Sequence, residues 1–345
     1  MDKKFELTNE TIVFRTRTLY RIKALKDFET VKAGDLGGFV EKESNLSQDG
    51  NCWIFENAKV YDNARVCNNA MICGYAVAYE NADIFSNAIV SGFAEICDNA
   101  KVHGHTRIYD NAEVLGDAEV YDDVHIYNNA WVSGKAQVFN SAQIFGNARV
   151  YGNTYICDNA KIYGDARVYG KAEVFNSAEV FNSAEVYDEA VVCDNALIRD
   201  NAEVYGNAKI CGNAIIKEQQ TVFVGVCTVD LSKNLKESIR CQTNLIPQKD
   251  YVIAFKQVNK DLTSFFDNTF QYKVGEWIEV KNPEISNMSC ASGLHFSNPS
   301  YWNHIADSDA VYLIAKIMLD DIITVQRGKI RCKRAFILDK YEIED

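Results

Sequence analysis

Residues 162–196 read IYGDARVYGKAEVFNSAEVFNSAEVYDEAVVCDNA, in which Ile or Val returns at every sixth position and Ala stands two residues before the next one. This six-residue period runs from Cys52 to Ile216 without an insertion. Val or Ile fills 27 of the 28 aliphatic positions, with Ala78 as the exception, and Ala fills 24 of the 28 small positions. Because residues two apart on a strand point to the same side, the small and the aliphatic residue share a buried face.

The second position after each aliphatic residue is Gly, Asp or Asn in 24 of the 28 hexads. These residues adopt left-handed or tightly turned backbone at low cost, so each hexad predicts a short strand that ends in a corner. Short strands with regular corners coil into a β-solenoid. The pattern small-x-aliphatic-x-x-x resembles the hexapeptide repeat of left-handed parallel β-helices, in which three hexads make one triangular coil. That resemblance implies a mainly β protein with about nine coils over residues 51–217.

The position directly after each aliphatic residue is rich in aromatic side chains and faces outward or lies near a corner. With 18 residues per coil, residues 18 apart stack on one another. Two of the resulting columns are Tyr109, Tyr127, Phe145, Tyr163 and Phe181, and Tyr151, Tyr169, Tyr187 and Tyr205. Two interpretations stay open: the rings stabilise neighbouring coils, or they form a docking surface for a partner or a sister subunit. Stacked asparagines such as Asn63, Asn81 and Asn99 are expected to support the coils as amide ladders.

Many hexapeptide-repeat helices are acyltransferases, which resemble one another in a His base near a cleft between subunits and in a loop that projects from a coil. The repeat of this sequence has no insertion for such a loop. His103, within VHGHTRI, takes the outward position after an aliphatic residue and is the candidate base for this chemistry. Because fold likeness alone does not confer activity, acyl transfer is an alternative hypothesis.

Residues 1–50 lack the period and are expected to form a small β cap over the end of the solenoid core. Gly34, Gly37 and Gly38 lie in VKAGDLGGFV with no Lys-Ser/Thr pair after them. They therefore predict a turn that leads onto the first coil rather than a phosphate loop. LYRIKAL and VKAGDLGGFVEKESNLS, followed by the NA-x-V hexads, resemble uncharacterised hexapeptide-repeat proteins of phage and prophage type.

The period ends after Ile216, and all three prolines follow it. We expect a capping strand and linker over 218–246 and an α+β domain over 247–345, with strands that include DYVIAFKQVNKDL and AVYLIAKIML. The ending GKIRCKRAFIL resembles a domain found behind phage repeat solenoids. SGLHFSNPSYW followed by VYLIAKIML is similar to ADP-ribosyltransferase folds, although that family's full triad has no match here.

His295 is the candidate catalytic residue of this C-terminal domain, and its candidate anion ligands are Lys256, Arg331 and Arg334. A structural His beside a basic edge strand would explain the same residues without a site.

The formal net charge of −12 argues against nucleic acid and anionic membranes as partners. With no secretory signal and no apolar run of spanning length, we expect a cytoplasmic protein whose eleven cysteines are mostly reduced. The sequence predicts a non-enzymatic binding or scaffold protein of phage type, without cofactor or metal, that acts on a host protein or sequesters a small ligand. Self-association through the solenoid is a further expectation. The alternatives are a hexapeptide-repeat acyltransferase and an ADP-ribosyltransferase-like activity in the C-terminal domain.

Overall fold

The computed structural model describes residues 3–341, apart from 266, 268, 285–291 and 303–309. The chain divides into two compact units, Met1–Asn195 and Ala196–Asp345. This division falls inside the six-residue repeat, so both units contain hexads. Part of the stretch CASGLHFSNPSYWNHI, at 290–291 and 303–305, lies outside the described residues.

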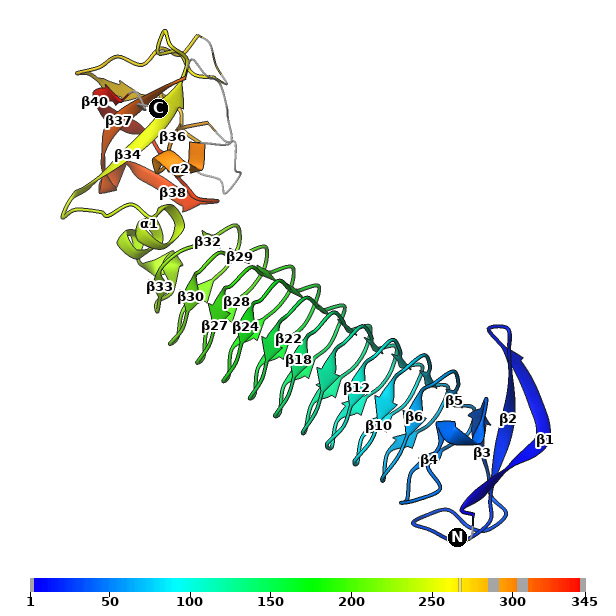
Figure 1. Cartoon of the computed structure of the whole chain (residues 1–345). Helices are drawn as coiled ribbons and strands as arrows, with labels where there is room; N and C mark the ends of the chain where they lie inside the picture. The colour runs from blue at the N-terminus through cyan, green and yellow to red at the C-terminus, as the bar shows by residue number, and fades with distance from the viewer. Residues whose placement is uncertain (1–2, 266, 268, 285–291, 303–309, 342–345) are drawn as a thin grey trace. The chain divides into compact units, whose positions relative to one another are not determined.

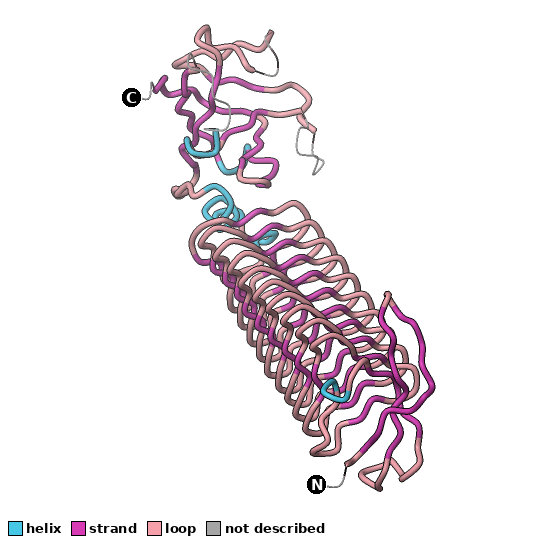
Figure 2. Tube along the Cα trace, turned by 45° about the vertical axis from the view of Figure 1, so that its right-hand side comes forward, coloured by secondary structure: helices cyan, strands magenta, loops and turns pink. Residues whose placement is uncertain are grey.

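The hexads of the first unit form a parallel β-solenoid, in which each two-residue strand pairs with the strand 18 residues further along (Figures 1 and 2). Three sheets run along it. The first sheet contains β3 (Leu36–Val40), β5 (Lys59–Val60), β8 (Val77–Ala78), β11 (Glu95–Ile96), β14 (Glu113–Val114), β17 (Trp131–Val132), β20 (Arg149–Val150), β23 (Arg167–Val168) and β26 (Glu185–Val186). The second contains β4 (Trp53–Ile54), β7 (Met71–Ile72), β10 (Ile89–Val90), β13 (Arg107–Ile108), β16 (His125–Ile126), β19 (Gln143–Ile144), β22 (Lys161–Ile162) and β25 (Glu179–Val180). The third contains β6 (Arg65–Val66), β9 (Asp83–Ile84), β12 (Lys101–Val102), β15 (Glu119–Val120), β18 (Gln137–Val138), β21 (Tyr155–Ile156), β24 (Glu173–Val174) and β27 (Val191–Val192).

The core of the solenoid consists of the small and aliphatic residues that the period places inward. Ala142 and Ile144 are fully buried, and so is Ala78, the one small residue in the aliphatic series. Corners between strands need left-handed backbone. At Gly134, φ is +68°, and a Cβ added there would lie 2.7 Å from the backbone nitrogen of Gly152 on the next coil. Glycine at such a corner therefore lets two coils approach one another closely.

The N-terminal segment extends the first sheet as an antiparallel hairpin, β1 (Phe5–Phe14) and β2 (Arg17–Ala24), followed by β3 and a short 3-10 turn, η1 (Glu43–Asn45). Gly37 and Gly38 lie inside β3 and not in a turn, which corrects the expectation from the sequence. A Cβ at Gly38 would lie 2.5 Å from the carbonyl oxygen of Ala58 and from Ile54 Cγ2. These glycines let β3 pack directly against the first coil.

The second unit begins with two-residue strands of the same kind: β28 (Leu197–Ile198), β29 (Glu203–Val204), β30 (Lys209–Ile210), β31 (Ile215–Ile216), β32 (Thr221–Val222) and β33 (Val226–Cys227). β32 and β33 lie beyond the recognisable repeat, in the segment expected to be a capping strand and linker, and they pair with β29 and β30. Val222 and Cys227 are fully buried, although Ala no longer precedes them. The solenoid therefore has about ten coils rather than nine.

The C-terminal part of the second unit is a small α+β region. It begins with η2 (Leu231–Lys233) and helix α1 (Leu235–Thr243), whose N-terminus is capped by Asn234. One sheet has the order β34 (Tyr251–Val258), β37 (Val311–Met318), β40 (Arg334–Tyr341), β35 (Trp277–Glu279). The other has the order β36 (Leu294–Phe296), β39 (Lys329–Cys332), β38 (Ile322–Gln326). Two short elements, α2 (Pro299–Trp302) and η3 (Leu319–Asp321), complete the region.

The structure confirms the fold class: the chain is mainly β, with a parallel β-solenoid and a small C-terminal α+β region. The left-handedness implied by the resemblance stays a prediction. Disulfides join none of the ten cysteines that lie within the described residues. In the same part of the chain, every helix falls short of the length and apolarity that a membrane crossing requires.

Candidate functional site

The first predicted ring column is present in the first unit, where successive rings stack almost in parallel. The ring centroids of Tyr109 and Tyr127 lie 5.0 Å apart with the planes 3° from parallel. Phe145 follows Tyr127 at 4.9 Å, and Tyr163 follows Phe145 at 4.8 Å. Because each ring covers its neighbours, the tyrosines of this column are half-buried.

The second column shows the same stacking. Tyr151 and Tyr169 are 5.0 Å apart, and Tyr169 and Tyr187 are 4.9 Å apart. In the second unit, Tyr205 stacks on Phe223 at 5.9 Å.

Two tyrosine hydroxyls of these ring columns also form hydrogen bonds between neighbouring coils. Tyr163 Oη donates to Glu179 Oε2 at 3.0 Å, and burial together with this carboxylate raises the pKa of Tyr163 to about 12. Tyr169 Oη donates to Glu185 Oε2 at 3.1 Å, and the pKa of Tyr169 is likewise raised, first by burial. Ring faces and hydroxyls thus hold neighbouring coils together. A docking role for these tyrosines stays a prediction.

His103, the candidate acyl-transfer base, is part of a third ring stack. Its imidazole lies between Phe85 at 4.5 Å and Tyr121 at 5.2 Å, nearly parallel to both rings. Nε2 is buried and lies 3.4 Å from Glu119 Oε1, close enough for an ion pair but outside hydrogen-bond geometry. His105, its neighbour in VHGHTRI, is exposed at a corner. The two histidines therefore stand in different environments, and the structure gives His103 a stacking role.

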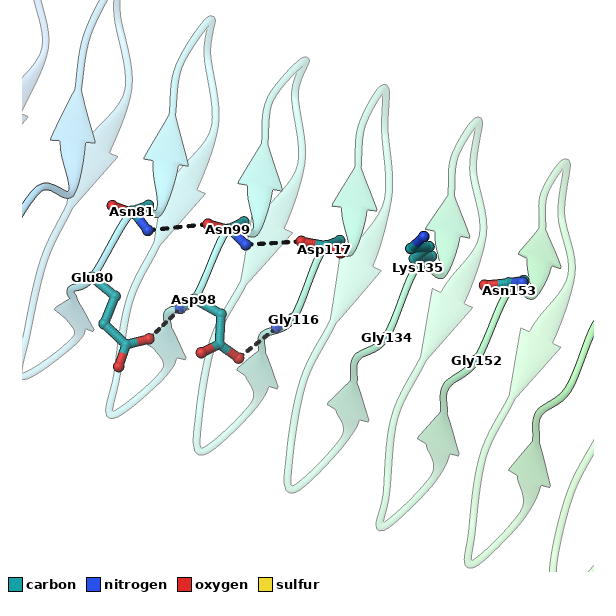
Figure 3. Close-up of a pocket in the computed structure, with 10 residues that line it drawn as sticks. All are labelled: Glu80, Asn81, Asp98, Asn99, Gly116, Asp117, Gly134, Lys135, Gly152 and Asn153. Carbon is teal, nitrogen blue, oxygen red and sulfur yellow. Dashed lines mark hydrogen bonds between the residues drawn. The ribbon is translucent and has the colours of Figure 1, made fainter.

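A polar groove of about 470 Å³ follows one corner of the first unit (Figure 3). Two columns line it: Glu80, Asp98, Gly116, Gly134 and Gly152, and Asn81, Asn99, Asp117, Lys135 and Asn153. Its side chains bond to each other along the column. Asn81 Nδ2 donates to Asn99 Oδ1 at 3.1 Å, Asn99 Nδ2 donates to Asp117 Oδ1 at 2.9 Å, and Gly116 N donates to Asp98 Oδ2 at 2.8 Å. This confirms the amide ladder, and its polar groups serve the coil-to-coil contact.

The second unit holds a cavity of about 580 Å³ in its α+β region. Lys256 on β34, His295 on β36, Lys329 on β39 and Lys281 supply its basic groups. Tyr272 and Trp302 are among its aromatic walls. The structure thus brings two predicted residues, Lys256 and His295, to the same site. An apolar cavity with a few converging polar groups is the usual form of a small-molecule site.

Lys256 occupies a core position of its strand. Val252, Ala254 and Val258 alternate with outward residues along β34 and are fully buried, and Lys256 lies in the same series with 5% of its surface exposed. Strand geometry therefore directs this lysine side chain into the interior instead of into solvent.

The ammonium group of Lys256 is held by aromatic rings and one carbonyl. Nζ lies 5.2 Å from the centroid of Trp302 and 5.7 Å from that of Tyr272, and donates to the carbonyl oxygen of His295 at 3.4 Å. Burial lowers the pKa of Lys256 to about 8, with a further contribution from the charge of Lys329. Near neutral pH the site therefore holds a buried lysine that exchanges between its charged and neutral forms.

His295 is the second titratable group of the cavity. Burial, and then the charges of Lys329, Lys256 and Arg331, lower its pKa to about 3, so the imidazole is neutral at physiological pH. Its Nε2 is buried and makes no hydrogen bond within the described part of the chain. A neutral imidazole with an unused nitrogen can form a hydrogen bond with a ligand in the cavity.

The two predicted arginine ligands are in different places. Arg331 lies opposite His295 on the neighbouring strand, is 1% exposed, and packs beneath Gly293, where a Cβ would lie 2.8 Å from Arg331 Cγ. Arg334 does not line the cavity. Its Nε donates to the buried Asp321 Oδ2 at 2.6 Å, and its guanidinium lies 5.1 Å from the ring of Trp277. The geometry thus gives Arg334 a structural role. Arg331 neighbours His295 but is not among the residues that line the cavity, so Lys256 and His295 are the predicted residues found there.

Tyr272 and Trp302 were not predicted as site residues. Trp302 was visible in the sequence SNPSYW, but its role depends on a contact with another strand: Nε1 donates to the carbonyl oxygen of Phe255 at 2.9 Å. Asn298 positions the short helix that carries it, since its Oδ1 accepts from Tyr301 N at 2.8 Å. The sequence around Tyr272 gave no indication of a site, because its ring reaches the cavity from a loop.

Comparison with known proteins agrees with the solenoid. A family model described as YdcK Beta solenoid repeat matches residues 142–158. The chain is also similar to the protein described as "Uncharacterized acetyltransferase YdcK" from Escherichia coli (strain K12). The two are 36% identical over 62 residues, which cover 16% of this chain and 19% of that protein. The match thus spans about a fifth of that relative's length and supports a β-solenoid of the hexapeptide type.

Proposed function

We propose that this chain is a non-enzymatic binding protein, in which the solenoid is the scaffold and the C-terminal cavity binds a small organic anion with an apolar or aromatic body. The observation that carries the proposal is the buried lysine of the cavity. Lys256 occupies a core position between two aromatic rings, and no ion pair in the described part of the chain includes it.

The energetics favour an anionic ligand. Burying an unpaired ammonium group costs several kcal/mol. A hydrogen-bonded partner of opposite charge offsets this cost. The carboxylates that line the cavity, Asp267 and Glu279, are exposed, and Asp267 accepts hydrogen bonds from Thr269. A ligand carboxylate or phosphate would supply the missing negative charge. Tyr272 and Trp302 would pack on an apolar or aromatic body.

Benzoate and benzamide test this proposal, because they share a shape and differ in charge. We expect benzoate to bind and benzamide to bind at least about tenfold more weakly, measured by saturation-transfer NMR on the full chain. Lys256→Met should remove the preference for benzoate. Lys316→Arg is the matched control, since Lys316 lies on the adjacent strand β37 over the ring of Tyr251 and does not line the cavity. Equal binding of both compounds to the wild-type protein would refute the proposal.

Benzoate binding should also weaken as pH rises. Lys256 carries its charge below its pKa of about 8 and loses it above that value. The affinity for benzoate should therefore fall between pH 7 and pH 9, while the affinity for benzamide stays constant.

A protein partner of the solenoid is a separate proposal, as are a phage origin, a cytoplasmic location and self-association. Support for docking comes from the exposed ring pair Tyr75 and Phe93, which are 52% and 61% exposed and stack at 5.2 Å. Capture of a host protein by the full chain, lost on Tyr75→Ser with Phe93→Ser and retained on Tyr155→Ser, would support this surface. Retention in the double variant would remove it.

Acyl transfer is the second candidate, favoured by the acetyltransferase description of the similar E. coli protein. It predicts that acetyl-CoA raises the melting temperature of the chain and that His103→Gln abolishes acetylation of an amine acceptor. ADP-ribosyl transfer makes the parallel prediction for NAD and His295→Gln. An unchanged melting temperature with either compound would remove the corresponding candidate.

A further inference from the structure

The cavity supports a more specific inference, which rests on the proposed anion site. We propose that Lys256 forms a reversible imine with a small carboxylated aldehyde or 2-oxo acid bound in the C-terminal cavity, so that the site traps reactive carbonyl compounds. Three observations support this chemistry: the position of the amine, its protonation, and the imidazole in the same cavity.

The position of the amine suits nucleophilic attack. Lys256 lines a cavity of about 580 Å³, large enough for a small aromatic acid, and its side chain is 95% buried in a core position of β34. Its Nζ makes one long hydrogen bond, 3.4 Å to the carbonyl oxygen of His295. The nitrogen is thus oriented but not engaged in an ion pair within the described residues.

The protonation state distinguishes this lysine from exposed ones. At pH 7.5, a pKa of about 8 leaves about a quarter of Lys256 as the free amine. That fraction is roughly 200 times larger than for a lysine with the ordinary value of 10.5. Desolvation in a hydrophobic pocket is one of the ways in which a lysine amine is activated as a nucleophile.

The reaction balances without an oxidant or a reductant. The Nζ lone pair attacks the carbonyl carbon, and a C–N bond forms as the C=O π electrons move to oxygen. A proton passes from nitrogen to that oxygen and gives the carbinolamine. Loss of the hydroxyl with a second proton releases one water and leaves the C=N bond. The neutral imidazole of His295 lines the same cavity, and its unused Nε2 is available for a hydrogen bond to the reacting carbonyl or carbinolamine.

The cationic side chains near the amine suit the ligand's acid group. Lys329 and Lys281 both line the same cavity. The ligand's carboxylate can lie among these cations while its carbonyl carbon meets Nζ. An aldehyde without an acid group would lack this orientation and should react more slowly.

The experiment uses 4-formylbenzoate, the aldehyde counterpart of benzoate, with sodium cyanoborohydride to reduce any imine to a stable secondary amine. Mass spectrometry of the intact full chain should show one rapid adduct at pH 7.5, and peptide mapping should place it on Lys256. Labelling of Lys256 should be at least about tenfold faster than that of Lys316, and this ratio should shrink as pH rises toward 10. Benzoate should slow the labelling of Lys256 only, and Lys256→Arg should remove the rapid adduct while Lys316→Arg retains it.

Adducts spread evenly over exposed lysines, or a first adduct on Lys281 or Lys329, would overturn the inference. Peptide mapping of the wild-type chain gives this answer even if Lys256→Arg does not fold. Binding of benzoate without a rapid adduct would refute the imine and leave the anion site standing. Failure of benzoate binding together with uniform labelling would refute both.

Discussion

Replacing Tyr127 by alanine tests whether the ring columns stabilise the solenoid. Tyr127 stacks on two rings, Tyr109 at 5.0 Å and Phe145 at 4.9 Å, with planes within 4° of parallel. Each stacked pair contributes about 0.5–1.5 kcal/mol beyond its buried area, so the two pairs together contribute about 1–3 kcal/mol. Loss of the half-buried ring surface adds about 1 kcal/mol. We therefore expect Tyr127→Ala to lower the free energy of unfolding by about 2–4 kcal/mol.

Urea denaturation of the full chain, followed by far-ultraviolet circular dichroism, measures this loss. Hydrogen exchange of the coils around Tyr109 and Phe145 then shows where it occurs. Tyr155→Ala is the matched control: Tyr155 is 44% exposed and has no stacked ring among the described residues, so its removal should cost less than about 1 kcal/mol.

A double-mutant cycle isolates the stacking itself. Tyr109→Ala combined with Tyr127→Ala should cost about 0.5–1.5 kcal/mol less than the sum of the single variants, because the shared stack is lost only once. If Tyr127→Ala costs no more than Tyr155→Ala, or if the cycle shows no coupling, the columns do not hold the coils together. Of the two interpretations of the ring columns, docking of a partner would then be the one that remains.

Three further predictions concern corners, acid stability and thiols. Gly134→Ala should lower the free energy of unfolding in urea by about 1–2 kcal/mol, and Gly134→Asn should lower it by less. The reason is that Asn128 and Asn140 already adopt φ of +57° at comparable corners. Equal losses for the two variants would contradict this reasoning. The pKa of His295 is about 3 in the folded chain and 6.5 in the unfolded chain. Between these values only the unfolded chain binds the proton, so the free energy of unfolding should fall as pH drops below 6.5, by up to about 2 kcal/mol at pH 5. His295→Gln should flatten this part of the pH profile, and an unchanged slope would show that another group causes it. Burial raises the pKa of Cys157 to about 11, so iodoacetamide at pH 8 should alkylate it far more slowly than glutathione; a comparable rate would contradict the burial argument.

The solenoid was predictable because its signal is local and repeated. The alternation of Ala and Val or Ile defines the inward face within each hexad, and 18 residues per coil then place Tyr109 over Tyr127. The sequence predicted a capping strand over 218–246, but not that β32 and β33 extend the coils there, because Gln220 and Gly225 stand where Ala would be. Both strands form because they pair with β29 and β30, although the Ala pattern has ended.

The C-terminal site was predictable only in part. The stretch SGLHF marked His295, and Lys256 was predicted as a candidate anion ligand for the same domain. Their aromatic neighbours come from distant segments, which one sequence does not connect. Arg334, which was predicted as an anion ligand, binds the buried Asp321, and nothing in KIRCKRAF shows this contact in advance.

The spacing of 18 residues between paired strands restricts how this molecule can change in length. Removing one hexad would leave the inward alternation intact, yet every later outer column would move to the next side of the coil, so that the rings of one column would lie over the residues of another. Removing three hexads would return each column to its own side. Natural lengthening and shortening of such a chain should therefore proceed by duplication or loss of 54 base pairs or multiples of it, with single-hexad changes confined to the ends.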